Sequence, residues 1–306
     1  PDVFAATIPP RPRPMTSIIM AGAAGAGKTT EVDRHRARSA ALRALPCYNP
    51  DLMGTSLAAA SAEVKRLVDE AVAQRTSFVW DGTAANWRLV LQYVEMAESP
   101  AMLMVFVHPA VALLQNAGRD RTVSFSAVLE TWSDVYGSAR RYHAALGERL
   151  IVCEPMAAMY GEEIQEFDEA AAAGPAALAY HVEELRGDGE GERGGGAGSE
   201  ARLKKAVAKL LRNYDEAFSV CRALARDRAQ VDAAIDQLVA TGEPPAWGAK
   251  APAKKEKRKP AAAPAPEPAE KKTKTTKTTT KPAPAREIPV GARRSRRARA
   301  DVSYAE

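Results

Sequence analysis

The residues most able to do chemistry form a glycine-rich run at 22–29. It reads Gly-Ala-Ala-Gly-Ala-Gly-Lys-Thr and matches the pattern G-x-x-x-x-G-K-[ST]. In such a loop the glycines let backbone N–H groups face a phosphate chain, while the lysine reaches the terminal phosphates and the threonine hydroxyl ligates Mg²⁺. The run therefore predicts a nucleotide-binding loop. The residues expected to hold the nucleotide are Gly22, Ala23, Gly25, Ala26, Gly27, Lys28, Thr29 and Thr30.

Two carboxylates follow later apolar runs. Asp51 comes after Tyr48-Asn-Pro, where it can accept the proton of an attacking hydroxyl or simply cap the next helical turn. Asp81 closes the run Phe-Val-Trp-Asp, where it can hold Mg²⁺ beside Thr29 or act as a turn residue before a glycine. We expect Asp51 to be a general base and Asp81 a metal ligand.

Two arginines, Arg119 and Arg121, lie on a short polar stretch before a helical segment. Arginines in this place can neutralise the charge that develops on a transferred phosphoryl group. The alternative is a solvated helix start. Three more arginines, Arg34, Arg36 and Arg38, follow the glycine-rich run, and we interpret them as a solvated helix face rather than a basic wall for an anionic substrate.

A parallel sheet would bring these groups to one edge. Short apolar runs alternate with helical patterns from residue 15 to about 155, which favours an α/β fold. The sequence predicts a three-layer sandwich with a five-stranded, mainly parallel sheet. The expected strands are 17–21, 45–49, 77–81, 102–108 and 149–153, and the expected helices are 29–44, 57–74, 86–97 and 126–146.

The remaining chain divides by composition. Residues 1–14 form a flexible Pro/Arg leader, 15–185 the α/β domain, 186–199 a Gly-rich linker, 200–243 a helical segment and 244–306 a tail. The helical segment is expected to dock on the domain as a hairpin, or to self-associate through 200–241.

The net charge of +5 is the sum of two unlike parts. The tail from 244 onward has 17 Lys and Arg against 6 Asp and Glu, or +11, so the preceding residues sum to −6. Its basic blocks and many prolines predict a disordered segment that binds nucleic acid or another polyanion through 250–299 by counterion release. An acidic protein surface, or a role in solubility or localisation alone, is the alternative.

The sequence gives no sign of a membrane, secretory or cysteine-based protein. Cys47, Cys153 and Cys221 form no CxxC pair, and no apolar run approaches the roughly 20 residues of a membrane helix. We expect a soluble, intracellular protein of the cytoplasm or nucleus, or of an organelle if the leader is a processed presequence.

Residues 16–155 resemble the zeta-toxin and polynucleotide-kinase-like group of P-loop kinases. The resemblance rests on the run at 22–29, Asn49-x-Asp51, Asp81-Gly-Thr and Arg119-x-Arg121. It implies a P-loop NTPase fold in which Lys28 and Thr29 hold ATP and Mg²⁺, Asp51 is the general base and the two arginines belong to a lid. The acceptors of such kinases include nucleotide sugars, nucleic-acid 5′ ends and small metabolites.

The expected function is ATP/Mg²⁺-dependent transfer of a phosphoryl group to an acceptor hydroxyl, with Asp51, Lys28, Arg119 and Arg121 as catalytic residues. A GTPase is disfavoured because no N-K-x-D motif occurs, and a motor or ABC ATPase because the core is small. The alternative is a scaffold that retains a nucleotide-binding fold and assembles on nucleic acid or partner chains through its tail and C-terminal helices.

Overall fold

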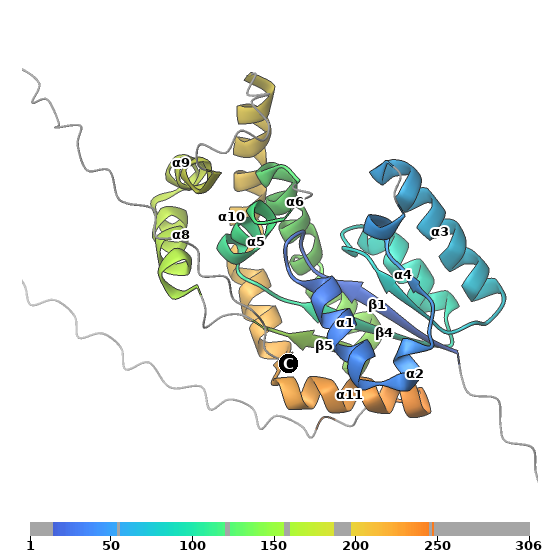
Figure 1. The fold of residues 1–306 in the computed structure, drawn as a ribbon. Helices are drawn as coiled ribbons and strands as arrows, with labels where there is room; N and C mark the ends of the chain where they lie inside the picture. Colours follow the sequence, from blue (N-terminus) through green and yellow to red (C-terminus); the bar gives the residue numbers. More distant parts are fainter. Residues whose placement is uncertain are drawn as a thin grey trace, which may run out of the picture. The chain divides into compact units, whose positions relative to one another are not determined.

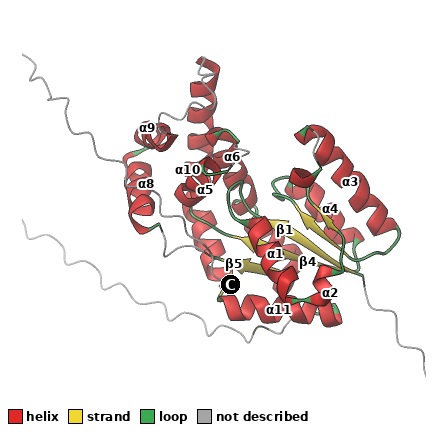
Figure 2. Ribbon diagram, viewed as in Figure 1, coloured by secondary structure: helices red, strands yellow, loops and turns green. Residues whose placement is uncertain are grey.

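Six parallel strands of the described residues form one sheet (Figure 2). The computed structural model describes residues 15–53, 56–119, 123–155, 160–186, 197–244 and 247, which all belong to one compact unit. The strands are β1 (Thr16–Ala21), β2 (Cys47–Tyr48), β3 (Phe78–Asp81), β4 (Ser99–Val105), β5 (Leu150–Cys153) and β6 (Ala225–Arg226). Their order is β2-β3-β1-β4-β5-β6, so β1 ends near the middle of the carboxyl edge.

The α/β class with a parallel sheet is confirmed, but the expected strand number is wrong. We expected five strands, mainly parallel, and the sheet has six, all parallel. The extra strand, β6, comes from the segment that the sequence predicts to be helical. It is only two residues long and half-buried, so it leaves no apolar run that the sequence pattern could reveal.

The expected helices are present, two of them broken, and the structure adds three at 109–117, 161–173 and 175–186 that the sequence analysis did not give. The helices are α1 (Lys28–Arg38), α2 (Ala40–Arg43), α3 (Leu57–Ala73), α4 (Trp87–Met96), α5 (Pro109–Ala117), α6 (Phe125–Tyr136), α7 (Ala139–Leu146), α8 (Gly161–Ala173), α9 (Pro175–Arg186), α10 (Ala197–Leu224) and α11 (Arg228–Thr241). The helix expected at 29–44 breaks at Ser39, whose hydroxyl accepts the N–H of Leu42 and caps α2. The helix expected at 126–146 breaks after Gly137, which ends α6.

Alternate side chains of each strand point to opposite faces of the sheet. Helices cover both of these faces. On one face, side chains of the central strands pack with α1, α2 and α11. The residues that meet there are Ile18, Met20, Val32, His35, Leu42, Val79, Leu103 and Ile235. On the opposite face, Phe78, which precedes Val79 on β3, packs with Val64 and Val68 of α3 and Tyr93 of α4. The central strands are therefore fully buried.

The helical segment at 200–243 packs into the same core (Figure 1). Helix α10 packs along α6, where Phe218 lies 5.1 Å from Phe106 and 5.7 Å from Trp132 between ring centroids. Aromatic contacts of this kind add about 0.5–1.5 kcal/mol beyond the area they bury. Self-association through this segment stays a prediction.

Helix α11 is fixed to α1 by a cluster of charged groups. Arg34 Nη1 lies 2.7 Å from Asp232 Oδ1 of α11, and Arg38 pairs with the same carboxylate. Arg228 of α11 in turn lies 3.0 Å from Glu31 of α1. Our interpretation of Arg34 as part of a solvated face is therefore wrong, because its side chain is partly buried and paired, whereas Arg38 is exposed as expected but also paired. Their partner lies almost 200 residues further along the chain, beyond the reach of any local pattern.

Several sequence predictions lie outside the described residues. They concern the leader at 1–14, most of the linker at 186–199, and the basic tail, including 250–299. Within the part of the chain that the structure describes, no helix has the length and apolar character needed to span a bilayer.

The Asp232 cluster gives a prediction about stability. Asp232→Ala should lower the free energy of unfolding by about 1–3 kcal/mol, because it removes the carboxylate that Arg34 and Arg38 share, while Arg34 keeps its ion pair with Glu31. The matched control is Asp236→Ala on the same helix, whose half-exposed carboxylate should contribute less than about 1 kcal/mol. If urea unfolding showed that the two variants lose the same free energy of unfolding, the role of Asp232 would be contradicted.

Protonation of His35 makes the stability of the packing between α1 and α11 depend on pH. Burial, and then the Arg34 cation, lowers the pKa of His35 from 6.5 to about 4. The unfolded chain therefore binds the proton first, so the stability contributed by neutral His35 is complete above about pH 6.5 and is lost as pH falls towards 4. Between pH 7 and 5, His35→Gln should lose about 2 kcal/mol less stability than the unaltered chain. If the free energy of unfolding changed by the same amount in both proteins between pH 7 and 5, this role of His35 would be contradicted.

Candidate functional site

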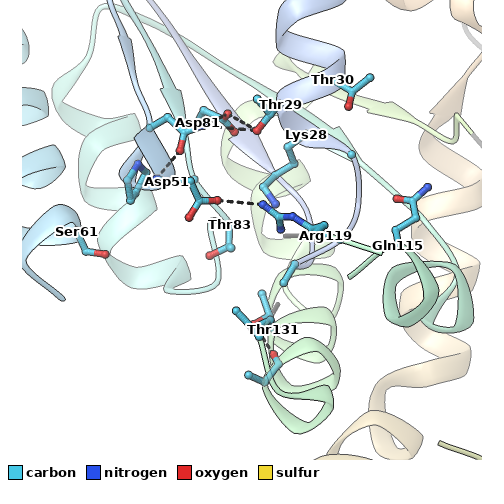
Figure 3. Close-up of a pocket in the computed structure, with 18 residues that line it drawn as sticks. Lys28, Thr29, Thr30, Asp51, Ser61, Asp81, Thr83, Gln115, Arg119 and Thr131 are labelled. Atoms are coloured by element: carbon cyan, nitrogen blue, oxygen red, sulfur yellow. Dashed lines mark hydrogen bonds and ion pairs between the residues drawn. The ribbon is translucent and has the colours of Figure 1, made fainter. Parts of the chain in front are cut away.

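A cavity of about 520 Å³ opens at the carboxyl edge of the sheet, where β1, β2 and β3 end (Figure 3). Parallel strands gather the residues that follow them at one edge, which is where α/β proteins bind ligands. The described residues that line the cavity are Ala24, Gly25, Gly27, Lys28, Thr29, Thr30, Asn49, Pro50, Asp51, Ser61, Asp81, Gly82, Thr83, Gln115, Arg119, Val123, Ala127 and Thr131.

The glycine loop, residues 22–29, joins β1 to α1. Gly25 and Gly27 have φ angles of 79° and 81°, a left-handed conformation that residues with a Cβ rarely adopt. A Cβ on Gly25 would also lie 2.2 Å from the carbonyl oxygen of Ala112 in α5, whereas one on Gly27 would have room. Glycine is therefore required at 25 by both backbone conformation and space.

Tyr136 of α6 fixes the start of this loop. Its hydroxyl accepts the backbone N–H of Ala23 at 3.2 Å and donates to the carbonyl of Val105 at 2.5 Å. The N–H of Gly22 in turn donates to the carbonyl of Thr83, which follows β3. Sequence reasoning missed Tyr136, because it lies 113 residues from Ala23 and reads as an ordinary core residue of an amphipathic helix.

Lys28 begins α1 and folds back over the loop. Its Nζ donates to the carbonyl of Ala23 at 2.9 Å. Burial lowers the pKa of Lys28 to about 8, while the nearby Asp81 carboxylate opposes that shift. A phosphate group at the loop would give this ammonium the anionic partner that offsets the cost of burying it.

Asp81 lies at the end of β3 beside Thr29 (Figure 3), and both belong to a hydrogen-bonded group with Asn49. Its Oδ2 accepts from Thr29 Oγ1 at 2.9 Å and from Asn49 Nδ2 at 2.7 Å. Burial raises the pKa of this carboxyl group. A carboxylate and a hydroxyl held this close form an oxygen donor set of the kind that Mg²⁺ prefers, so the two residues fit the predicted metal site.

Asp51 lies in the same cavity, at the start of the short 3₁₀ turn Pro50–Leu52. The side-chain oxygen of Asn49 accepts the backbone N–H of Asp51 at 2.8 Å, and Asp51 Oδ2 lies 3.3 Å from Arg119 Nη2. Both partners of this ion pair are half-exposed. Arg121 lies outside the described residues.

The structure thus brings Lys28, Thr29, Asp51, Asp81 and Arg119 to one cavity. Sequence reasoning gave no role to four further hydroxyl and amide side chains of the lining, on Ser61, Thr83, Gln115 and Thr131, and named Thr83 only as part of the Asp81-Gly-Thr turn. Thr83 had a signal, because it follows Asp81 in the turn after β3. The other three lie on helices, where a single polar residue is indistinguishable in sequence from any solvent-facing one.

A scan against protein-family models matches no family, and a search of the curated proteins finds no match. The geometry and chemistry of the cavity are therefore the basis for assigning a function.

Two glycines of the loop form a matched pair for a test. Gly27→Ala should cost about 1–2 kcal/mol of stability, from the strain of a left-handed φ alone. Gly25→Ala carries the same strain and adds a clash with the backbone of α5, so it should cost at least about 2 kcal/mol more. The measurement is denaturant unfolding of both variants. Equal losses would show that α5 does not confine the loop.

Proposed function

We propose that this chain is an ATP- and Mg²⁺-dependent kinase of the P-loop NTPase class that phosphorylates a hydroxyl of its acceptor. The observation that carries the proposal is the meeting of a lysine, two carboxylates and an arginine at one cavity beside the glycine loop. These are the charge types that phosphoryl transfer requires. The resemblance of residues 16–155 to zeta-toxin and polynucleotide-kinase-like kinases supports the same reaction.

The glycine loop and Lys28 bind and orient the phosphates of ATP. Thr29 and Asp81 would hold Mg²⁺, which neutralises charge on the phosphate oxygens when bound. The buried carboxylate of Asp81 favours this role, because a cation would offset the cost that raises its pKa. Thr30 lines the cavity and is suited to contact the nucleotide.

Asp51 accepts the proton of the acceptor hydroxyl. The acceptor oxygen forms a bond to the γ-phosphorus while the bond from that phosphorus to the β–γ bridging oxygen breaks, and ADP leaves with those electrons. Arg119 stabilises the charge on the transferred group, which requires it to exchange its contact with Asp51 for one with the phosphate. Arg121 is proposed for the same role on the resemblance alone.

The pair between Arg119 and Asp51 also favours a second function, because it leaves the expected base bound to a cation. In that case the chain is a scaffold that binds nucleotide without turning it over. The basic tail and the C-terminal helices would then assemble it on nucleic acid or partner chains. Under either function we propose that residues 250–299 bind nucleic acid or another polyanion.

Two substitutions distinguish these functions. Asp51→Asn should lower the phosphoryl-transfer rate about 10²–10⁴-fold while nucleotide affinity stays nearly unchanged, because only the proton acceptor is lost. Lys28→Ala should lower both, since it also removes a phosphate contact. The measurements are transfer of labelled γ-phosphate to candidate acceptors and nucleotide binding by calorimetry.

The matched control is Asp236→Asn, an exposed carboxylate on α11 that does not line the cavity. It should leave both measurements unchanged. Retained transfer in both Lys28→Ala and Asp51→Asn would exclude the proposed mechanism, and nucleotide binding without any transfer by the unaltered chain would favour the scaffold.

A further inference from the structure

Part of the cavity lining that phosphoryl transfer does not use consists of uncharged side chains, which we call the acceptor region. Its described residues are Ser61, Thr83, Val123, Ala127 and Thr131. In Figure 3, Thr83 follows β3, Ser61 lies on α3 and Thr131 lies on α6, and all three line the same cavity as Asp51. An acceptor with its hydroxyl at Asp51 would extend into this region.

The charged groups of the described lining are Lys28, Asp51, Asp81 and Arg119. Phosphoryl transfer uses all four, so the acceptor region has no cation of its own among the described residues. A nucleotide sugar or a nucleic-acid end would bring phosphate charge into it. Bound phosphates are normally met by arginine, lysine or a helix N-terminus, because an unpaired buried charge is costly. The N-terminus of α6 does lie between Val123 and Ala127, but there the side chain of Ser124 already accepts the backbone N–H of Ala127 at 3.3 Å.

The described lining also contains no aromatic ring. Nucleobases in protein sites are commonly held by stacking on such rings, worth about 1–3 kcal/mol per base. The tryptophans of β3 and α4 have other ring contacts. Trp80 meets Tyr93 edge-on at 5.2 Å, and the ring of Trp87 has the guanidinium groups of Arg88 and Arg141 over it.

The hydroxyl groups of the acceptor region complement one another. Thr131 Oγ1 donates to the carbonyl of Ala127 at 2.6 Å, so its oxygen can accept from a ligand hydroxyl. Thr83 Oγ1 accepts the N–H of Ala85 at 3.4 Å, so its hydrogen can be donated to a ligand oxygen. Val123 and Ala127 add apolar contact for C–H groups. Alternating hydroxyl and C–H groups are the surface of a polyol or a sugar.

We infer that the acceptor is a small, uncharged, polyhydroxylated molecule of the polyol or monosaccharide class, bound in the acceptor region with one hydroxyl at Asp51. This inference rests on the proposed kinase function and narrows its substrate. The basic tail then has no part in holding the acceptor.

The test supplies the full chain with labelled ATP, Mg²⁺ and one acceptor at a time. The acceptors are free monosaccharides and polyols, sugar phosphates, nucleosides, nucleotide sugars and oligonucleotides with a 5′-hydroxyl. The kcat/KM for at least one neutral polyol or monosaccharide should exceed that for every charged or base-containing acceptor by tenfold or more.

Two variants locate the binding. Thr131→Val and Ser61→Ala should each raise the KM for the neutral acceptor about 5- to 30-fold and leave the KM for ATP unchanged, because each removes a hydrogen bond to the acceptor alone. Ser219→Ala, an exposed serine of α10 away from the cavity, is the matched control and should change neither constant.

The outcomes separate this inference from the proposed function. A preference for oligonucleotides, nucleosides, sugar phosphates or nucleotide sugars overturns the acceptor class and leaves the kinase in place. Transfer to water alone also overturns the acceptor class, while it retains nucleotide use. If no transfer depends on Lys28, the kinase itself fails, and the acceptor class fails with it.

Discussion

The side-chain amide of Asn49 is the contact on which the candidate site depends. It is 4% exposed, donates to Asp81 at 2.7 Å and accepts the backbone N–H of Asp51 at 2.8 Å. One buried group therefore joins the Asp81 carboxylate at the end of β3 to the backbone of Asp51, which follows β2. Asp81 in turn accepts from Thr29 at the start of α1, so the ends of β2, β3 and the glycine loop are tied together by a few short hydrogen bonds. Because buried polar groups without partners are costly, this arrangement is favoured only when all its members are in place.

The far end of α1 is fixed by a different kind of contact. Arg34 and Arg38 pair with Asp232 of α11, and Arg228 of α11 forms an ion pair with Glu31 of α1. Helix α10, which precedes α11, packs its aromatic residues against α6, the helix that carries Tyr136 to the glycine loop. The segment at 197–244 therefore supports both helices that position the site. It completes the core of the α/β unit and is not merely attached to its surface.

The parts of the fold and site that the sequence predicts depend on residues that lie close together along the chain. The spacing of glycines with Lys28 and Thr29, and the carboxylate that ends a buried run at Asp81, are signals within a few neighbouring residues, and the alternation of strands and helices predicts a parallel sheet. The features that were missed depend on distant partners. The role of Arg34 needs Asp232, and that of Tyr136 needs a loop 113 residues away. No periodic pattern encodes such pairings, so they appear only when the chain has folded.

The two outermost strands of the described sheet have a consequence for how the protein meets other proteins. β2 and β6 are each only two residues long, at opposite edges of a sheet whose inner strands are longer. A long, flat edge strand is a template on which another chain can add by main-chain pairing, and it is a common origin of aggregation. Here β2 and β6 offer almost no main-chain hydrogen-bonding groups with which another strand could pair. The strands rich in Ile, Met and Val at the centre are thus shielded from intermolecular β-pairing by the brevity of their outermost neighbours.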